Sequence, residues 1–319
     1  MAVDTAPDPV EVPRSEAAPQ WLRRIFWANL VAQIGIVITG GIVRVTGSGL
    51  GCPTWPECVE GSITPTSEQT ETWHRFVEFG NRTLTGVLMV LAVAALVGVI
   101  VWRRRTTVHR TWVFALAAVP LLGTIAQAVL GGITVLVDLH PMSVAGHLLL
   151  SMAVIAGCVA LVQFSAETTD PPGTALTRPA TRILGNALIG VTAVILVMGT
   201  VVTGSGPHAG DAATVRLNLD PRLISWLHAD VVLLFIGLLI GMLALLHVDH
   251  ASPAARRRAW WVVAFATLQA SVGYVQYFTG LPWVVVTLHL LGACLVWAGV
   301  WFLRLSLTQR GNPTPGHQG

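Results

Sequence analysis

The stretch Val87-Leu-Met-Val-Leu-Ala-Val-Ala-Ala-Leu-Val-Gly-Val-Ile-Val-Trp102, followed directly by Arg103-Arg-Arg105, decides the fold class of this chain. Together with the residues just before it, it forms an apolar run over 79–102, long enough to cross about 30 Å of hydrocarbon as a helix. The apolar residues are continuous rather than alternating, which argues against a transmembrane β-barrel. The run therefore predicts a membrane-spanning α-helix that ends at a cluster of arginines.

Seven more apolar runs of similar length occur in the sequence, so we expect eight transmembrane helices. The composition agrees, because 53% of the 319 residues are hydrophobic and only 11% are charged, whereas a soluble domain carries about 25% charged residues. The mean hydropathy of +0.67 likewise excludes an ordinary cytosolic enzyme. The expected spans lie at roughly 25–45, 79–102, 112–137, 142–164, 183–203, 226–247, 260–279 and 282–303.

The distribution of arginine predicts the topology, since the chain contains no lysine. Most arginines lie in the N-terminal tail, in the segments following the second, fourth and sixth runs, and at the C-terminus. The positive-inside rule then places both termini in the cytoplasm and the loops at 46–78 and 204–225 outside. Short clusters beside apolar runs are not the pattern of a nucleic-acid-binding surface, so we expect the lipid bilayer as a partner and no nucleic acid.

The four cysteines divide into two pairs. Cys52 and Cys58 lie in the first outer loop, and two loop cysteines alone cannot form a four-ligand zinc site. If the loop faces an oxidising compartment, a disulfide is the better interpretation. Cys158 and Cys294 lie inside apolar spans, where small apolar packing is the simplest expectation.

The sequence also repeats itself. Gln127-Ala-Val-Leu-Gly131 matches Gln269-Ala-Ser-Val-Gly273, with His147 and His289 at the same distance after each Gln, and Thr46-Gly-Ser-Gly49 matches Thr203-Gly-Ser-Gly206. We therefore expect an all-α membrane protein of eight transmembrane helices arranged as two pseudo-symmetric four-helix bundles, related by an axis along the membrane normal. The expected organisation is a disordered tail at 1–22, an N-terminal half at 23–165, a linker at 166–182, a C-terminal half at 183–305 and a tail at 306–319.

Three histidines, His147, His228 and His289, lie within apolar spans and toward the outer face. Ionisable groups in a span are costly and usually face the bundle interior. His228 and His289 belong to the same half, and two imidazoles facing each other across a four-helix bundle are suitable axial ligands for haem iron. The alternative for each is a hydrogen bond to a neighbouring helix. His140 and His208, on outer loops or span edges, are left without an assigned role.

In the second span, the sequence does not decide which residue would be the iron ligand. The pattern Glu-x-x-(His or Asn)-Arg occurs twice, beginning at Glu71 and at Glu78, and a spacing of seven residues puts both copies on one helix face. Asn81 lies at the depth of the other candidate ligands, but an amide is a poor iron ligand. His74 is a good ligand type but lies about two turns farther out.

Charged groups accompany these positions. Glu78 in a partly buried apolar site is a candidate for proton transfer, with an ion pair to Arg75 or Arg82 as the alternative. Arg44 and Arg82, near the outer ends of the first two spans, are candidates to pair with haem propionates, or else they anchor the helices at the interface.

With these residues the chain resembles the haem A synthase family, from about residue 25 to 305. The resemblance is carried by Gly40-Gly-Ile-Val-Arg-Val-Thr-Gly-Ser-Gly-Leu-Gly-Cys-Pro-Thr-Trp-Pro-Glu-Cys58, by the Glu-x-x-x-Arg element of the second span, by Gln127-Ala-Val-Leu-Gly-Gly-Ile-Thr-Val135 and by the span histidines. It implies an oxidoreductase of the cell membrane that oxidises the C8 methyl of haem O to a formyl group, giving haem A for terminal oxidases.

The resemblance also implies a role for each candidate. A haem b cofactor would be held by His228 and His289, and the substrate haem O by His147 and a residue of the second span, His74 or alternatively Asn81. Arg82 and Arg44 would belong to the substrate site, Glu78 or alternatively Glu71 would be the functional acid, and the cysteine pair would be Cys52 and Cys58. The implied partners are haem O synthase and oxidase assembly factors, with homo-oligomerisation left open.

The second span departs from the family pattern, Glu-x-x-His-Arg-x-x-x-Gly. The best match here is Glu78-x-x-Asn81-Arg82-x-x-x-Gly86, so Asn81 occupies the histidine position. Two alternatives to the enzyme remain. A bis-His membrane cytochrome would carry electrons without altering a haem, and a transporter with parallel repeats would need broken helices and a polar midplane site.

Overall fold

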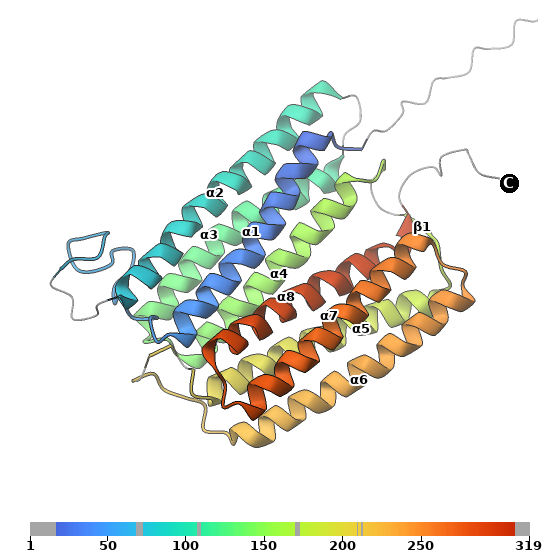
Figure 1. Ribbon diagram of the computed structural model, residues 1–319. Coiled ribbons are helices and arrows are strands. Elements are labelled where there is room, and N and C mark those ends of the chain that lie inside the picture. The colour runs from blue at the N-terminus through green and yellow to red at the C-terminus, as the bar shows by residue number, and fades with distance from the viewer. Residues whose placement is uncertain are drawn as a thin grey trace, which may run out of the picture.

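A computed structural model of the chain describes residues 17–67, 73–106, 110–169, 173–208, 210–211 and 213–309. Long helices dominate it (Figure 1), and the strands β1 (Thr174–Ala175) and β2 (Thr308–Gln309) form a short antiparallel pair. The helices are α1 (Gln20–Val45), α2 (His74–Arg105), α3 (Thr111–Leu136), α4 (Pro141–Ser165), α5 (Pro179–Ser205), α6 (Pro221–Val248), α7 (Pro253–Phe278) and α8 (Trp283–Leu305).

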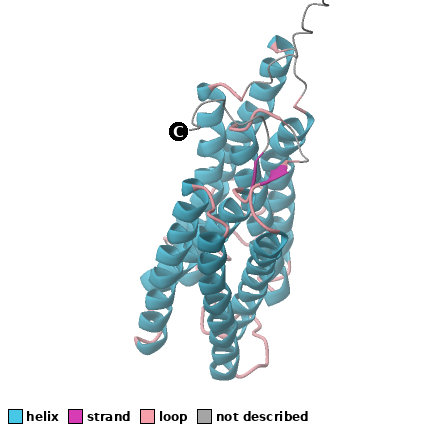
Figure 2. Cartoon of the chain, turned by 90° about the vertical axis from the view of Figure 1, so that its right-hand side faces the viewer, coloured by secondary structure: helices cyan, strands magenta, loops and turns pink. Residues whose placement is uncertain are grey.

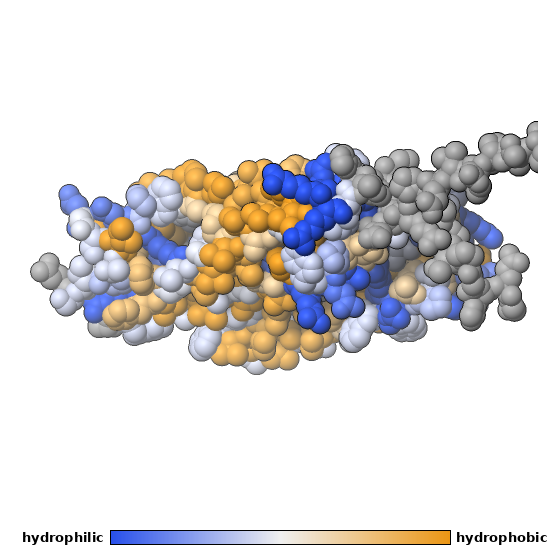
Figure 3. Space-filling view, turned by 90° about the horizontal axis from the view of Figure 1, so that it is seen from above, coloured by the Kyte–Doolittle hydropathy of each residue, from blue (hydrophilic) through white to orange (hydrophobic). Residues whose placement is uncertain are grey.

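The predicted helical fold is confirmed, with one helix at each predicted span to within a few residues. In the described part of the chain, seven helices are long and apolar enough to cross a membrane. The exception is α7, which carries Arg256, Arg257 and Arg258 near its start. Figure 3 shows apolar side chains gathered along the middle of the molecule and hydrophilic ones toward its ends. The chain is therefore an integral membrane protein.

Several helices extend beyond the apolar runs from which they were predicted. α1 begins at Gln20, within the segment predicted as a tail, and α2 begins at His74, within the predicted outer loop. Proline occupies the first position of α4, α5, α6 and α7, where its fixed φ and missing N–H suit a helix start. Hydropathy marks only the part of each helix that lies in hydrocarbon, so it underestimates their length.

The helices pack in two sets, which lie beside each other in Figure 1. In the first, α1 contacts α2 and α4, and α3 contacts α2 and α4; in the second, α5 contacts α6 and α8, and α7 contacts α6 and α8. The sets meet where α8 packs against α1 and α4, and where α4 packs against α5. The long helices lie roughly side by side, with loops at the two ends of the molecule (Figure 2).

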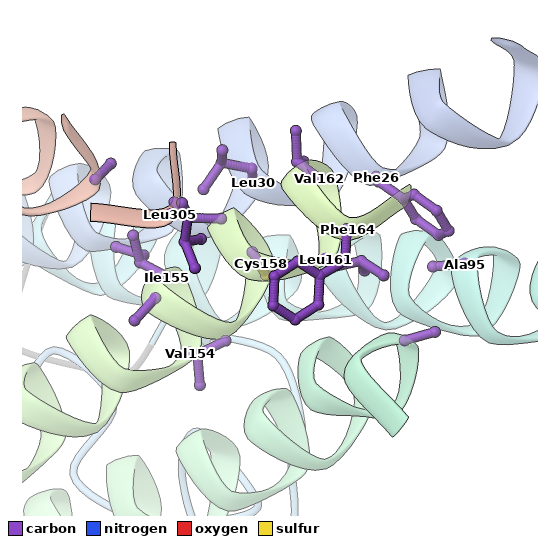
Figure 4. Close-up of a cluster of buried hydrophobic side chains, with 14 of the residues drawn as sticks. Phe26, Leu30, Ala95, Val154, Ile155, Cys158, Leu161, Val162, Phe164 and Leu305 are labelled. Carbon is purple, nitrogen blue, oxygen red and sulfur yellow. The ribbon is translucent and has the colours of Figure 1, made fainter. Parts of the chain in front are cut away.

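The largest apolar core lies where the two sets meet. Figure 4 shows part of it, including Phe26 and Leu30 of α1, Ile155 and Leu161 of α4, and Leu305 of α8. The indole Nε1 of Trp297 donates to the Met152 carbonyl at 2.7 Å, joining α8 to α4. The free thiols Cys158 and Cys294 are buried in the same core, in the apolar setting expected for them.

The turns that end α3 and α7 have the same conformation. Leu139 N–H donates to the Thr134 carbonyl at 2.9 Å, and Leu281 N–H donates to the Gln276 carbonyl at 3.0 Å. Both leucines have positive φ, 58° and 62°, which is uncommon for a residue other than glycine. The internal repeat seen in the sequence thus extends to the backbone of these turns.

Asp249, just after α6, holds the start of α5. Its carboxylate accepts hydrogen bonds from Thr181 Oγ1 at 2.7 Å and from the Arg178 backbone N–H at 3.0 Å, and it pairs with the Arg178 side chain at 3.3 Å. The Thr181 bond, followed by the Arg178 backbone and charge, keeps the pKa of Asp249 below its ordinary value. The carboxylate therefore acts as a charged cap for a helix that has none of its own.

We expect Asp249→Ala to lower the free energy of unfolding by about 1 kcal/mol at neutral pH. Because the folded-state pKa is lowered, this contribution is present at neutral pH and is lost as the pH falls through that pKa. Thermal unfolding of the purified chain in detergent at neutral and strongly acidic pH measures it. Asp249→Asn is the matched control for the charge, and an equal deficit for Asp249→Ala at both pH values would contradict the assignment.

Candidate functional site

In the first helix set, α3 presents two residues to His147 of α4. Gln127 Nε2 donates to the His147 carbonyl at 3.0 Å and to Ser151 Oγ at 2.7 Å. One turn farther along α3, a Cβ added to Gly131 would lie 3.2 Å from His147 Cε1. Glycine at this position therefore lets the imidazole lie against the helix backbone, and Gln127 holds the same turn of α4 in place.

The second set repeats this arrangement. Gln269 Nε2 donates to the His289 carbonyl at 2.9 Å, and a Cβ on Gly273 would lie 3.2 Å from His289 Cε1. His228 of α6 packs against Gly199 of α5, whose Cβ would lie 3.5 Å from its Cε1. His228 of α6 and His289 of α8 thus lie in the same half, each against a glycine of a neighbouring helix.

The ring nitrogens of these histidines suit a bound metal. Nδ1 of His147 and Nδ1 of His289 are buried without a hydrogen-bond partner. Within the described residues, Nε2 of His147 and of His289 forms no hydrogen bond either. Buried polar groups normally have partners, and a missing one is costly. Unpaired imidazoles at matching places in both halves therefore fit axial ligation of haem iron through Nε2.

Along α2, the two copies of the Glu-x-x-(His or Asn)-Arg pattern differ in what they contact. Asn81 packs against α1, where a Cβ on Gly40 would lie 3.8 Å from its Nδ2, and its Oδ1 lies 2.7 Å from Thr39 Oγ1. His74 is the first residue of α2, and its ring contacts that of Trp73 in a tilted arrangement, with ring centroids 4.0 Å apart. Asn81 and His228 thus each contact a glycine of the preceding helix, Gly40 of α1 and Gly199 of α5. Glu71, the alternative acid, lies outside the described residues.

Glu78 and Arg82 form a buried ion pair that holds the first outer loop. Arg82 Nη2 lies 2.5 Å from Glu78 Oε1, and Glu78 Oε2 accepts the Cys52 backbone N–H at 2.7 Å. Arg82 also donates to the carbonyls of Cys52, Thr54 and Glu57. A guanidinium has five N–H donors, and these contacts use all of them. The ion pair weighed as the alternative for Glu78 is therefore present, and Arg82 has no donor left for a propionate in this arrangement.

The predicted disulfide is present between Cys52 and Cys58. The loop that it closes carries Trp55, whose indole lies on the backbone of α3: a Cβ on Gly132 would be only 2.4 Å from Trp55 Cδ2. Gly132 directly follows Gly131, which contacts His147. The repeat places Tyr274, an exposed side chain, at the corresponding position of α7. In the first half, a loop tryptophan therefore packs on the α3 backbone one residue after the glycine that contacts His147.

We expect Gly132→Ala to displace Trp55 and to lower the free energy of unfolding by about 1–3 kcal/mol, because overpacking forces a ring or the backbone to move. Gly190→Ala is the matched control, since nothing lies within 4 Å of a Cβ there. Faster proteolysis of the outer loop, together with a lower unfolding temperature, would confirm the contact. Equal loop proteolysis and equal stability in the two variants would contradict it.

Arg44 joins the two helix sets at the same end of the molecule. Its Nε donates to the His208 carbonyl at 2.7 Å, and His208 Nε2 lies 2.9 Å from the Leu281 carbonyl. Nearby, the Gly49 N–H donates to the Gly210 carbonyl at 3.1 Å. His140 is the N-cap of α4 and accepts the Met142 N–H at 3.3 Å. His140 and His208 thus have structural contacts, while Arg44 keeps donors available for a ligand.

The contacts of Trp55, Thr39 and Ser151 were not predicted from the sequence. Ser151 follows His147 by one helical turn, so helical periodicity could have placed it near Gln127. For Trp55 a weak signal existed in the pair Gly131-Gly132, of which the repeat preserves only the first glycine as Gly273. Nothing in the sequence alone indicates that Thr39 contacts Asn81.

Known proteins match this chain over most of its length. The model of the COX15-CtaA family, described as cytochrome oxidase assembly protein, matches residues 23–301. A Heme A synthase of Sphingopyxis alaskensis is 28% identical over 89% of this chain and 90% of its own. A Heme A synthase of Bacillus cereus is 24% identical over 88% of this chain. One of Geobacillus thermodenitrificans is 26% identical, but the match covers only 42% of that relative.

The family match agrees with the arrangement described above, in which histidines of α4, α6 and α8 are presented by glycines of neighbouring helices. It spans both helix sets and the disulfide loop, and so is not limited to a local motif. The chain therefore belongs to the COX15-CtaA family of cytochrome oxidase assembly proteins.

Proposed function

We propose that this protein is a haem A synthase, a membrane oxidoreductase that converts the C8 methyl of haem O to a formyl group. The observation that carries the proposal is the repeated set of glutamine, glycine and unpaired histidine, Gln127–Gly131–His147 and Gln269–Gly273–His289. A repeated site suits an enzyme that handles two haems, one as substrate and one as cofactor. The names of the full-length relatives agree with this activity.

In this proposal the second half holds haem b between His228 and His289. When bound there, haem b supplies one-electron transfer. The chain's part is to fix the two imidazoles: Gly199 and Gly273 let them lie against α5 and α7, and the Gln269 amide holds the backbone of His289. Orientation of the ligands by such neighbours is a general requirement of a retained metal centre.

The first half then holds haem O, with His147 as the ligand from α4. Arg44, with donors not used by the protein, is the candidate for a propionate. Arg82 instead acts by holding the disulfide loop, and Trp55 with it, beside the site. Glu78 is proposed as the functional acid, placed where the loop backbone meets α2.

The two helix sets are proposed to be pseudo-symmetric four-helix bundles, each with its haem toward the outer face. All eight helices span the membrane in this proposal, α7 included, because its arginines lie at one end and the rest of the helix is apolar. Both termini then lie in the cytoplasm, where arginine clusters follow α2 and begin α7. The disulfide loop faces the outside, which suits an oxidised cysteine pair.

The test is to express the chain in a host that makes haem O but no haem A, and to separate the haems extracted from its membranes. Haem A is expected with the wild-type chain and not with His147→Ala. A host that contains only haem B and haem O, with the chain folded and oxygen and reductant present, would overturn the proposal. That result would favour the alternative of a bis-His cytochrome, since His228 and His289 would still suit an electron carrier.

A further inference from the structure

The two halves differ at one of the positions proposed to face the haem iron. In the second half, His228 on α6 lies against Gly199 on α5; in the first half, Asn81 on α2 lies against Gly40 of α1, which the match of Thr46-Gly-Ser-Gly49 with Thr203-Gly-Ser-Gly206 places two residues earlier in its helix than Gly199. The other position is alike in both, since His147 and His289 lie against Gly131 and Gly273 at equal distances. The chain therefore offers two imidazoles in one half and one imidazole with one amide in the other.

The Asn81 amide is held in place. Its Oδ1 lies 2.7 Å from Thr39 Oγ1, and its Nδ2 faces Gly40. A neutral amide is a poor iron ligand, because haem iron in proteins is bound by histidine, cysteine, methionine or tyrosine side chains. Asn81 thus stands where a second axial ligand would be expected, but its amide does not bind the haem iron.

The other histidines near this half lie away from Asn81 or have protein contacts. His74 lies seven residues before Asn81, about 10 Å farther along the helix, and its ring is tilted by 40° against that of Trp73. His140 accepts a backbone N–H at the start of α4, and His208 lies against the Leu281 carbonyl. Among the described residues, His147 is the one histidine of the first half with a buried ring nitrogen that has no hydrogen-bond partner.

We propose that the substrate haem in the first half is ligated by His147 alone, with the Asn81 amide in the place that His228 occupies in the second half. This inference rests on the function proposed above, and it adds that the two haem sites differ in the number of histidine ligands. A substrate must leave after conversion, and one protein–iron bond instead of two favours exchange. The cofactor must stay, and two histidines retain it. The axial position beside Asn81 stays open to a small ligand.

Ligand binding and spin state test this in the full chain, purified with haem b in the second half and then loaded with haem O. For the wild type we expect one low-spin haem and one high-spin haem, of which only the latter binds carbon monoxide in the reduced state. Asn81→His is expected to make both haems low-spin, to abolish carbon monoxide binding and to slow transfer of haem O to apomyoglobin at least about tenfold. Asn81→Leu, the control for shape, should still bind carbon monoxide.

The reciprocal variant, His228→Asn, provides the matched test in the other half. It should convert the haem b site to a high-spin centre that binds carbon monoxide. A wild-type first-half haem that is low-spin and does not bind carbon monoxide would overturn the inference, and its conversion to high-spin by His74→Ala would identify His74 as the second ligand. If the wild type takes up no haem O at all, the proposed function itself fails. If Asn81→His does not fold, the spin states and carbon monoxide binding of the wild type, Asn81→Leu and His228→Asn still test whether His147 is the only protein ligand of the substrate haem.

Discussion

Replacing His289 with alanine is expected to reduce the haem b content of the purified protein to less than about a tenth of wild type. His289 is one of the two histidines proposed to hold haem b in the second half, and its buried Nδ1 has no hydrogen-bond partner in the protein. Loss of one axial ligand and of its packing against Gly273 removes the bond that retains the haem. Turnover of haem O should fall at least about 100-fold if the second haem supplies electrons.

His247→Ala is the matched control, because His247 lies exposed in the last turn of α6. Pyridine haemochrome analysis measures haem b content, and binding of haem O to the first half serves as the internal reference. Partial recovery of the spectrum by added imidazole would show that the lost group is the ligand itself. Full haem b content in His289→Ala would contradict the assignment of this pair.

The second large effect is expected at Arg82. Arg82→Ala leaves the Glu78 carboxylate buried without its charge partner and leaves the carbonyls of Cys52, Thr54 and Glu57 without their donor. Breaking a buried pair by removing one member costs about 3–5 kcal/mol. We therefore expect a clear fall in unfolding temperature and rapid proteolysis of the disulfide loop. Arg216→Ala, at an exposed arginine with one carbonyl contact to Pro207, should change neither.

Glu78→Gln separates the two roles considered for this acid. The amide keeps an oxygen to accept the Cys52 N–H but removes the charge that pairs with Arg82. If Glu78 acts in proton transfer, this variant should lose haem A formation while still binding both haems, and its loop should be cleaved more slowly than in Arg82→Ala because the Arg82 bonds to the loop carbonyls remain. If it retains wild-type turnover, Glu78 serves only to hold the loop.

The fold was largely predictable because continuous apolar runs and arginine clusters are strong signals in a membrane protein. α7 is not among the seven helices of the described chain that are apolar enough to cross a membrane, because Gln269, Ser271 and Gln276 lie within it in addition to the three arginines near its start. Helix ends outside the hydrocarbon, such as Gln20 of α1 and His74 of α2, were missed because polar residues there carry no hydropathy signal.

The site was predictable where the chain repeats itself. The common spacing from Gln to His identified His147 and His289, and the structure adds that Gln127 and Gln269 bind the carbonyl of the histidine that each precedes. The sequence could not decide between propionate binding and loop binding for Arg82, because its partners are backbone carbonyls that no side-chain pattern reveals. The contact between Trp55 and Gly132 could not be predicted either, because it depends on the backbone conformation of the loop that carries Trp55.

The most direct measurement is a mass balance of the haems during a single turnover by the purified chain. We expect haem O bound in the first half to be replaced by an equal amount of haem A while haem b stays constant. We also expect His147→Ala to bind haem b normally but neither to hold nor to convert haem O. Consumption of haem b, or conversion of haem O by His147→Ala at the wild-type rate, would contradict the division of one substrate half and one cofactor half.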